Sequence, residues 1–174
     1  MTKNNKNPNS SHDSKTGYVF KDFIPLILIF LIIAILTILR SYISHVWNSQ
    51  ELMMNAMGAF FIIFGSFKIM KLTQFAEAYA MYDIIAKHSH AYALAYPFIE
   101  LTLGILYFMH IGAPAINIIT LILMVISNIG VANKLWQREQ IMCACLGTVF
   151  KIPMTYVTLL EDVVMAIMAL TLLL

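Results

Sequence analysis

The only two cysteines of this 174-residue chain lie close together, in a segment that reads QIMCACLGT over residues 140–148. They are Cys143 and Cys145, and a single residue separates them. Side chains at positions i and i+2 point to different faces of a helix but to the same side of an extended backbone. Gly147 and Pro153 follow the pair and favour a non-helical conformation. The spacing therefore predicts that both sulfur atoms lie on one side of the chain.

Two thiols at this spacing can do chemistry in two ways. They can close a small, strained disulfide, which is easily reduced and is therefore a good oxidant. They can also present two thiolates to a soft metal such as Cu(I) or Hg(II), which accepts few sulfur ligands. We predict that Cys143 and Cys145 are the reactive residues and the metal ligands. The alternative is that both are small apolar side chains that pack near a helix end.

A second set of candidates consists of polar side chains within, or at the ends of, long apolar segments. Its members are Lys68, Glu100, Asn128, Glu161 and Asp162. Glu100 lies about 12 Å, and the acidic pair at 161–162 about 10 Å, from the same end of their segments at 1.5 Å per helical residue. Carboxylates within a membrane are costly, and they are normally paired or line a cavity. The pattern predicts a polar pocket that tunes the thiols or exchanges protons. Ion pairs that only lock the helices together are the alternative.

The composition of the chain indicates which class of protein carries these residues. Of the chain, 60% is apolar and only 11% is charged, and the mean hydropathy is +0.80. A soluble domain is about half apolar and about a quarter charged. The net charge of +2 is too small for a nucleic-acid binder, and the chain has no GxGxxG or Walker A motif for a nucleotide. The sequence predicts an integral membrane protein surrounded by a lipid bilayer.

Five apolar segments are long enough to cross that bilayer, whose core of about 30 Å needs roughly 20 helical residues. They cover residues 23–39, 52–69, 92–109, 113–131 and 155–174. The short turn at 110–114 makes the third and fourth segments antiparallel neighbours. Gly58 and Gly65 in the second segment provide positions where another helix can approach closely. The predicted fold is an all-α membrane protein with five transmembrane helices.

The segment between the second and third spans has a different pattern. Apolar residues recur every three or four positions, at Leu72, Phe75, Tyr79, Tyr82 and Ile85, with Gln74, Glu77 and Asp83 between them. This spacing is typical of an amphipathic helix that lies in the membrane interface. We predict such a helix over residues 72–86, with its tyrosines anchored at the membrane surface.

The distribution of basic residues predicts the orientation. Residues 1–22 are polar, have no hydrophobic periodicity and are predicted to form a disordered tail. Arg40 is the one basic residue, out of 11, that falls on the opposite side of a five-span arrangement. Because basic loops stay in the cytoplasm, the N-terminus is predicted to be cytoplasmic and the C-terminus periplasmic.

Several strings along the chain resemble the MauE/DoxX-like family. They are FGSFK (64–68), YAMYDIIAK (79–87), AYPFIE (95–100), CACLGT (143–148), PMT (153–155) and LED (160–162). The resemblance covers about residues 50–174. It implies that the last four spans form a DoxX-like antiparallel four-helix bundle, with residues 23–43 as an extra N-terminal helix.

The same resemblance implies a function. Members of the family are bacterial inner-membrane proteins described as redox-associated, and MauE is required for maturation of methylamine dehydrogenase, where it is thought to assist disulfide formation. A thiol-containing partner protein is therefore expected, with at most a thiol–disulfide oxidoreductase-like activity. Relatives with the CACLGT string often carry an N-terminal heavy-metal domain with its own C-x-x-C. Residues 1–22 contain no cysteine, so metal delivery to Cys143 and Cys145 would need a separate metal chaperone.

Overall fold

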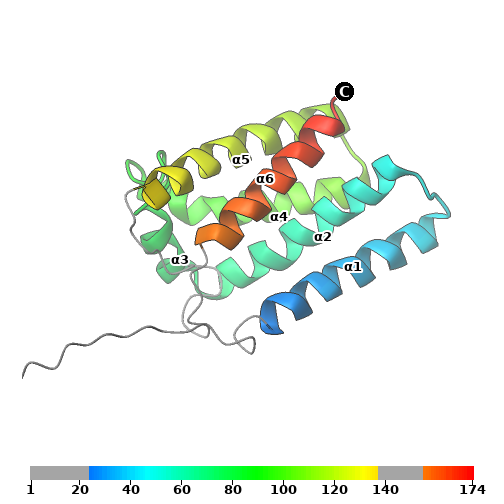
Figure 1. The fold of residues 1–174 in the computed structure, drawn as a ribbon, viewed down its shortest axis with the longest axis horizontal. Coiled ribbons are helices and arrows are strands. Elements are labelled where there is room, and N and C mark those ends of the chain that lie inside the picture. The colour runs from blue at the N-terminus through cyan, green and yellow to red at the C-terminus, as the bar shows by residue number, and fades with distance from the viewer. Residues whose placement is uncertain (1–23, 137–154) are drawn as a thin grey trace, which may run out of the picture.

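The computed structural model describes residues 24–136 and 155–174. The predictions for residues 1–22, for Cys143 and for Cys145 lie outside this part of the chain. The helices are α1 (Ile24–Ser44), α2 (Ser49–Met70), α3 (Leu72–Tyr79), α4 (His90–Met109), α5 (Ala113–Trp136) and α6 (Thr155–Thr171), and no strand occurs between them in the described ranges. The five long helices run alternately in opposite directions, while the short α3 lies at one end of the bundle (Figure 1).

Four of the described helices are long and apolar enough to cross a membrane. Their spans are Leu26–Ser44, Ser49–Met70, His90–Met109 and Ala113–Trp136. These confirm four of the five predicted spans. The fifth predicted span falls on α6, which has 17 residues and is shorter than the others, so its crossing of the membrane stays a prediction.

Helix α2 packs closely against α4 because small residues face each other. A Cβ atom added to Gly104 of α4 would lie only 2.8 Å from Ile62 Cγ1 and 3.1 Å from the carbonyl oxygen of Gly58 on α2. A Cβ atom on Gly65 would lie 3.2 Å from the Leu101 side chain of α4. The prediction that Gly58 and Gly65 are close-packing positions is therefore confirmed.

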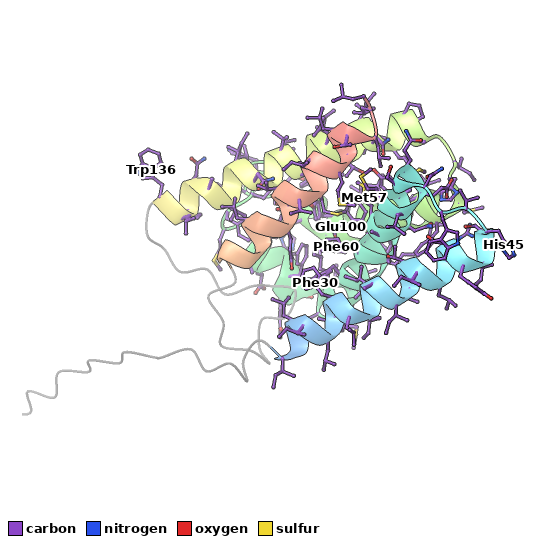
Figure 2. All side chains as sticks on the ribbon, turned by 45° about the vertical axis from the view of Figure 1, so that its right-hand side comes forward. Phe30, His45, Met57, Phe60, Glu100 and Trp136 are labelled. Atoms are coloured by element: carbon purple, nitrogen blue, oxygen red, sulfur yellow. The ribbon has the colours of Figure 1, made fainter. Side chains whose placement is uncertain are left out.

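Helix α1 packs along α2, with Ile29 and Ile33 against Ala59 and Phe64. Most of its other apolar side chains are exposed and point away from the bundle, as expected for a helix in contact with lipid (Figure 2).

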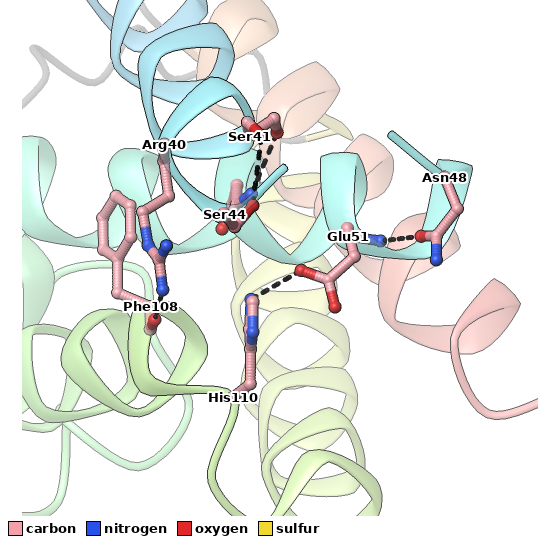
Figure 3. Close-up of polar contacts among 8 residues, drawn as sticks. Arg40, Ser41, Ser44, Asn48, Glu51, Phe108 and His110 are labelled. Carbon is pink, nitrogen blue, oxygen red and sulfur yellow. Dashed lines mark hydrogen bonds and ion pairs between the residues drawn. The ribbon is translucent and has the colours of Figure 1, made fainter. Parts of the chain in front are cut away.

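Polar contacts near the C-terminal end of α1 add to this packing (Figure 3). Arg40 Nη2 donates a hydrogen bond to the Phe108 carbonyl oxygen at 3.1 Å. Asn55 Nδ2 donates to Ser41 Oγ, also at 3.1 Å. Both Ser41 and Asn55 are fully buried, so these bonds satisfy groups that lipid could not. The N-terminal helix is thus joined to the bundle by specific contacts.

The predicted helix over residues 72–86 is only partly correct, because α3 ends at Tyr79. Asp83 terminates it by forming a turn. Its Oδ1 atom accepts hydrogen bonds from the backbone N–H groups of Ile85 (2.9 Å) and Ala86 (2.8 Å), and its Oδ2 atom accepts one from the Tyr79 hydroxyl (2.9 Å). Asp83 competes for backbone donors that a continuing helix would use.

The burial of this segment also differs from the prediction. Asp83, expected on a polar face, is 0% exposed, and Tyr79, expected to anchor at the membrane surface, is 2% exposed. Tyr79 packs with Phe75 and Tyr96 in a cluster between α3 and α4. Tyr79 and Asp83 are therefore buried against neighbouring parts of the protein and do not lie at the surface, where the periodicity alone would put them.

Candidate functional site

A buried ion pair joins α2 to α4. Lys68 Nζ lies 2.5 Å from Glu100 Oε1, and the two side chains are 11% and 4% exposed. Lys68 is in the last turn of α2, while Glu100 lies ten residues into α4, about 15 Å along the helix. Figure 2 shows Glu100 within the bundle. Lys68 therefore turns its charge into the protein, toward Glu100.

Aromatic rings surround the ammonium group of this pair. Lys68 Nζ lies 5.3 Å from the Phe75 ring centroid and 5.1 Å from the Tyr96 ring centroid. Ring faces carry negative potential and attract a cation at this distance, most strongly where water is excluded. The ammonium group of Lys68 on α2 is thus held by one carboxylate and two aromatic faces from α3 and α4.

The tyrosines continue the polar arrangement toward the turn after α3. The Tyr79 and Tyr96 ring centroids are 4.5 Å apart. Tyr79 in turn donates to Asp83. Burial raises the pKa of the Tyr79 hydroxyl well above its ordinary value, so this group stays neutral and keeps its proton.

The other acidic candidates lie on α6. Ser127 Oγ of α5 donates a hydrogen bond of 2.6 Å to Asp162 Oδ2. Glu161 and Asn128 are half-buried, and Asn128 Oδ1 accepts no hydrogen bond from the described part of the chain. The structure thus brings Lys68 into contact with Glu100, and Asp162 into contact with Ser127. The chemical role of these residues stays a prediction.

The residues between α5 and α6 carry the two cysteines. Trp136, at the end of α5, and Thr155, at the start of α6, both lie at the end of the bundle that holds α3 (Figure 1). Across residues 24–136 and 155–174, no group of three or more His, Cys, Asp or Glu side chains could hold a metal ion. The prediction of a soft-metal site therefore rests on Cys143 and Cys145 alone.

The tyrosines and Asp83 were not predicted from the sequence to be parts of the polar arrangement. A signal was present, because Tyr92, Tyr96 and Glu100 follow one another at four-residue intervals and so share one face of a helix. Tyr79 and Asp83 have the same spacing. Tyr79 was predicted to be a membrane anchor, and no role was predicted for Tyr92 or Tyr96, so this pattern was missed.

A separate polar cluster lies toward the opposite end of the bundle. The Tyr107 hydroxyl donates to Asn117 Oδ1 at 2.9 Å and lies 3.0 Å from Thr120 Oγ1. Asn117 Nδ2 reaches the Leu172 carbonyl oxygen at 3.5 Å. This cluster joins α4, α5 and the end of the chain, and it contains no acidic or basic side chain.

Comparison with known proteins identifies the family. The sequence model of the family described as methylamine utilisation protein MauE matches residues 48–174, close to the range of about 50–174 expected from the resemblance. No curated protein and no solved structure shows significant similarity to the chain. The matched range contains α2 to α6, the Lys68–Glu100 pair and both cysteines. The chain is therefore a multi-pass membrane protein that belongs to the MauE family.

Proposed function

We propose that the protein is a thiol–disulfide exchange protein of the bacterial inner membrane, acting through Cys143 and Cys145. By analogy with the family name, it assists the maturation of a thiol-containing partner protein in methylamine utilisation. The observation that carries this proposal is the buried Lys68–Glu100 pair. The carboxylate of this pair, Glu100, lies inside the bundle. The end of α5 and the start of α6, which flank residues 137–154, lie at the end of the bundle that holds α3. Intramembrane charges of this kind mark functional sites.

The exchange reaction is balanced without another reactant. A thiolate of the partner attacks one sulfur atom of the Cys143–Cys145 disulfide and forms a mixed disulfide, which the partner's second thiolate then resolves. The partner loses two electrons and two protons and gains a disulfide, while Cys143 and Cys145 become thiols. A carboxylate such as Glu100 can accept or supply one of these protons.

The same two thiolates support a second use. Paired thiolates bind soft metals such as Cu(I), and the described part of the chain offers no competing site with several His, Cys, Asp or Glu ligands. A metal chaperone would then be the partner. If neither activity exists, the cysteines only pack, and the protein is a structural membrane partner.

We infer that the end of the bundle with α3 faces the cytoplasm. Lys71, Lys87 and Lys134 lie at that end, whereas Arg40 contacts Phe108 at the opposite end, in agreement with the positive-inside rule. A single-cysteine variant, Asn5→Cys with both native cysteines replaced by serine, tests this orientation. A membrane-impermeant maleimide added to intact cells should not label it, and labelling from outside would reverse the orientation.

Because the chain has only two cysteines, thiol alkylation reports on this pair alone. The wild-type protein in native membranes is treated with a mass-shifting maleimide before reduction, after reduction, and after reduction with Cu(I) added. Disulfide exchange predicts labelling only after reduction, and metal binding predicts protection by Cu(I). Equal labelling in all three samples would contradict both functions. Cys143→Ser and Cys145→Ser serve as single-thiol controls.

A further inference from the structure

We propose that Glu51, Asn55 and His110 form a binding site for a divalent transition-metal ion of the Zn²⁺ class, at the end of the bundle opposite α3. Glu51 and Asn55 lie in the first two turns of α2, and His110 follows the last residue of α4. The site contains neither cysteine, so the inference is independent of the proposed thiol chemistry.

The contact between Glu51 and His110 has the spacing of two ligands of one metal ion. Their side chains point toward each other from α2 and from the end of α4 (Figure 3), with His110 Nε2 3.2 Å from Glu51 Oε2. Both atoms are buried, and neither makes a hydrogen bond within the described part of the chain. Two ligand atoms that bind one Zn²⁺ tetrahedrally, each at about 2.0–2.1 Å, lie about 3.3 Å apart. The two atoms are thus close enough to share an ion, although they form no directed hydrogen bond with each other.

Asn55 supplies a third ligand atom beside this pair. It follows Glu51 by four residues, so both side chains lie on one face of α2, and a helical side chain leans over the preceding turn, here the turn of Glu51. Asn55 is 0% exposed. Its Nδ2 atom donates to Ser41 Oγ at 3.1 Å, whereas its Oδ1 atom accepts no hydrogen bond from the described residues. A buried amide oxygen without a partner costs free energy, which a bound cation would recover.

The ligand types select the class of ion. An imidazole nitrogen together with carboxylate and amide oxygens suits Zn²⁺ and similar transition-metal ions. Ca²⁺ and Mg²⁺ prefer a shell made of oxygen atoms, so the histidine disfavours them. Only two of the three ligands are of the His, Cys, Asp or Glu type, in agreement with the finding that residues 24–136 and 155–174 hold no group of three such residues for a metal. Three protein ligands leave a fourth position for water.

The charges at this end of the bundle are compatible with a bound cation. Glu51 lies in the first turn of α2, where the helix dipole favours a carboxylate, and the carboxylate is the form that binds a metal. His110 is the C-cap of α4, where the dipole favours positive charge. The basic side chain of this region, Arg40, donates to the Phe108 carbonyl oxygen at 3.1 Å.

The position of the histidine is fixed by the backbone before any ion binds. His110 has a left-handed conformation with φ 54°, and its backbone N–H donates to the Tyr107 carbonyl oxygen at 3.1 Å. A metal ion held here would join the start of α2 to the end of α4. Because such an ion binds the folded protein, it should raise the unfolding temperature, and a chelator should reverse the effect.

The test measures Zn²⁺ binding directly. The full-length protein, with Cys143 and Cys145 replaced by serine and without a histidine tag, is treated with a chelator and placed in lipid nanodiscs. Zn²⁺ is added during isothermal titration calorimetry, and thermal unfolding is followed with and without the ion. We expect one Zn²⁺ per chain at this site and a higher unfolding temperature when Zn²⁺ is present. A protein that binds no Zn²⁺ would overturn the proposal.

Three variants assign the ligands. His110→Gly, Glu51→Gln and Asn55→Leu should each weaken Zn²⁺ binding by about tenfold or more, since even the loss of a group that only orients a ligand costs about 10–100-fold. Glycine tolerates the left-handed backbone of residue 110, and Glu51→Gln keeps the size of the side chain, so it provides the test if another variant does not fold. His45→Ala is the matched control, because His45 is an exposed histidine at the same end of the bundle. Its affinity should equal that of the parent protein.

The outcomes separate this inference from the proposed function. Parent affinity in any of the three ligand variants, or an equal loss in His45→Ala, would overturn the site. Since the protein in this experiment carries no thiols, that result would leave the exchange activity of Cys143 and Cys145 intact. Conversely, unreactive cysteines in the alkylation experiment would refute the thiol function but not a measured Zn²⁺ site.

Discussion

The Lys68–Glu100 ion pair makes a quantitative prediction that a double-mutant cycle can test. Lys68→Met and Glu100→Leu each remove one partner and leave the other charge buried at 4% or 11% side-chain exposure. Removal of one partner from a buried pair typically costs about 3–5 kcal/mol, whereas replacement of both by apolar residues is often about neutral. The two variants have side chains of similar volume to those they replace, which keeps packing losses small.

We therefore expect each single variant to lose about 3–5 kcal/mol of unfolding free energy. The double variant should lie within about 1 kcal/mol of wild type, giving a coupling energy far above the range for independent sites. Unfolding is measured in mixed detergent micelles by following tyrosine and tryptophan fluorescence. Glu77→Leu, at an exposed position of α3, is the control for loss of a carboxylate and should change stability by less than about 0.5 kcal/mol. Additive losses in the double variant would refute the pairing.

Two further predictions concern a close backbone contact and the cysteines. In Gly130→Ala the new Cβ atom would lie 2.4 Å from the Tyr82 carbonyl oxygen, so thermal unfolding should show a loss of about 1–3 kcal/mol in unfolding free energy. Gly65→Ala, in which the new Cβ atom meets mainly a movable side chain, should lose less. An equal loss in the two variants would mean that the turn containing Tyr82 does not pack against α5. Cys143→Ser and Cys145→Ser should each behave like the double variant in disulfide-exchange and copper-stress assays, because a single thiol cannot form the disulfide. If all three variants behaved like wild type, the cysteines would serve only in packing.

The membrane helices could be predicted from sequence because their signal is local. A run such as residues 23–39 is apolar throughout, and in a bilayer every backbone group must bond within its own helix. The close approach of α2 and α4 was visible at Gly58 and Gly65, since small residues permit such contacts. Gly104, which completes the contact, was not recognised, because its importance depends on the register between two helices.

The polar arrangement was harder to predict because it depends on which side chains meet. The sequence indicated that Lys68 and Glu100 lie in the same half of the membrane, and the structure adds that they form an ion pair. The end of α3 was missed because the same Asp83 that looks like a polar-face residue in a helical pattern can also cap a turn. Tyr79 was expected at the surface because aromatic periodicity does not distinguish lipid from a neighbouring helix.

The proposed function requires that Cys143 and Cys145 form a redox-active pair. The decisive measurement is the reduction potential of the pair in native membranes, obtained by alkylation after equilibration in dithiothreitol and glutathione redox buffers whose potentials extend from below to well above about −300 mV. The strain of a disulfide across one intervening residue predicts a two-electron midpoint above about −300 mV, the region where labile and catalytic disulfides lie. Free thiols across the whole range of buffers, or a midpoint below that value, would contradict a role in disulfide exchange.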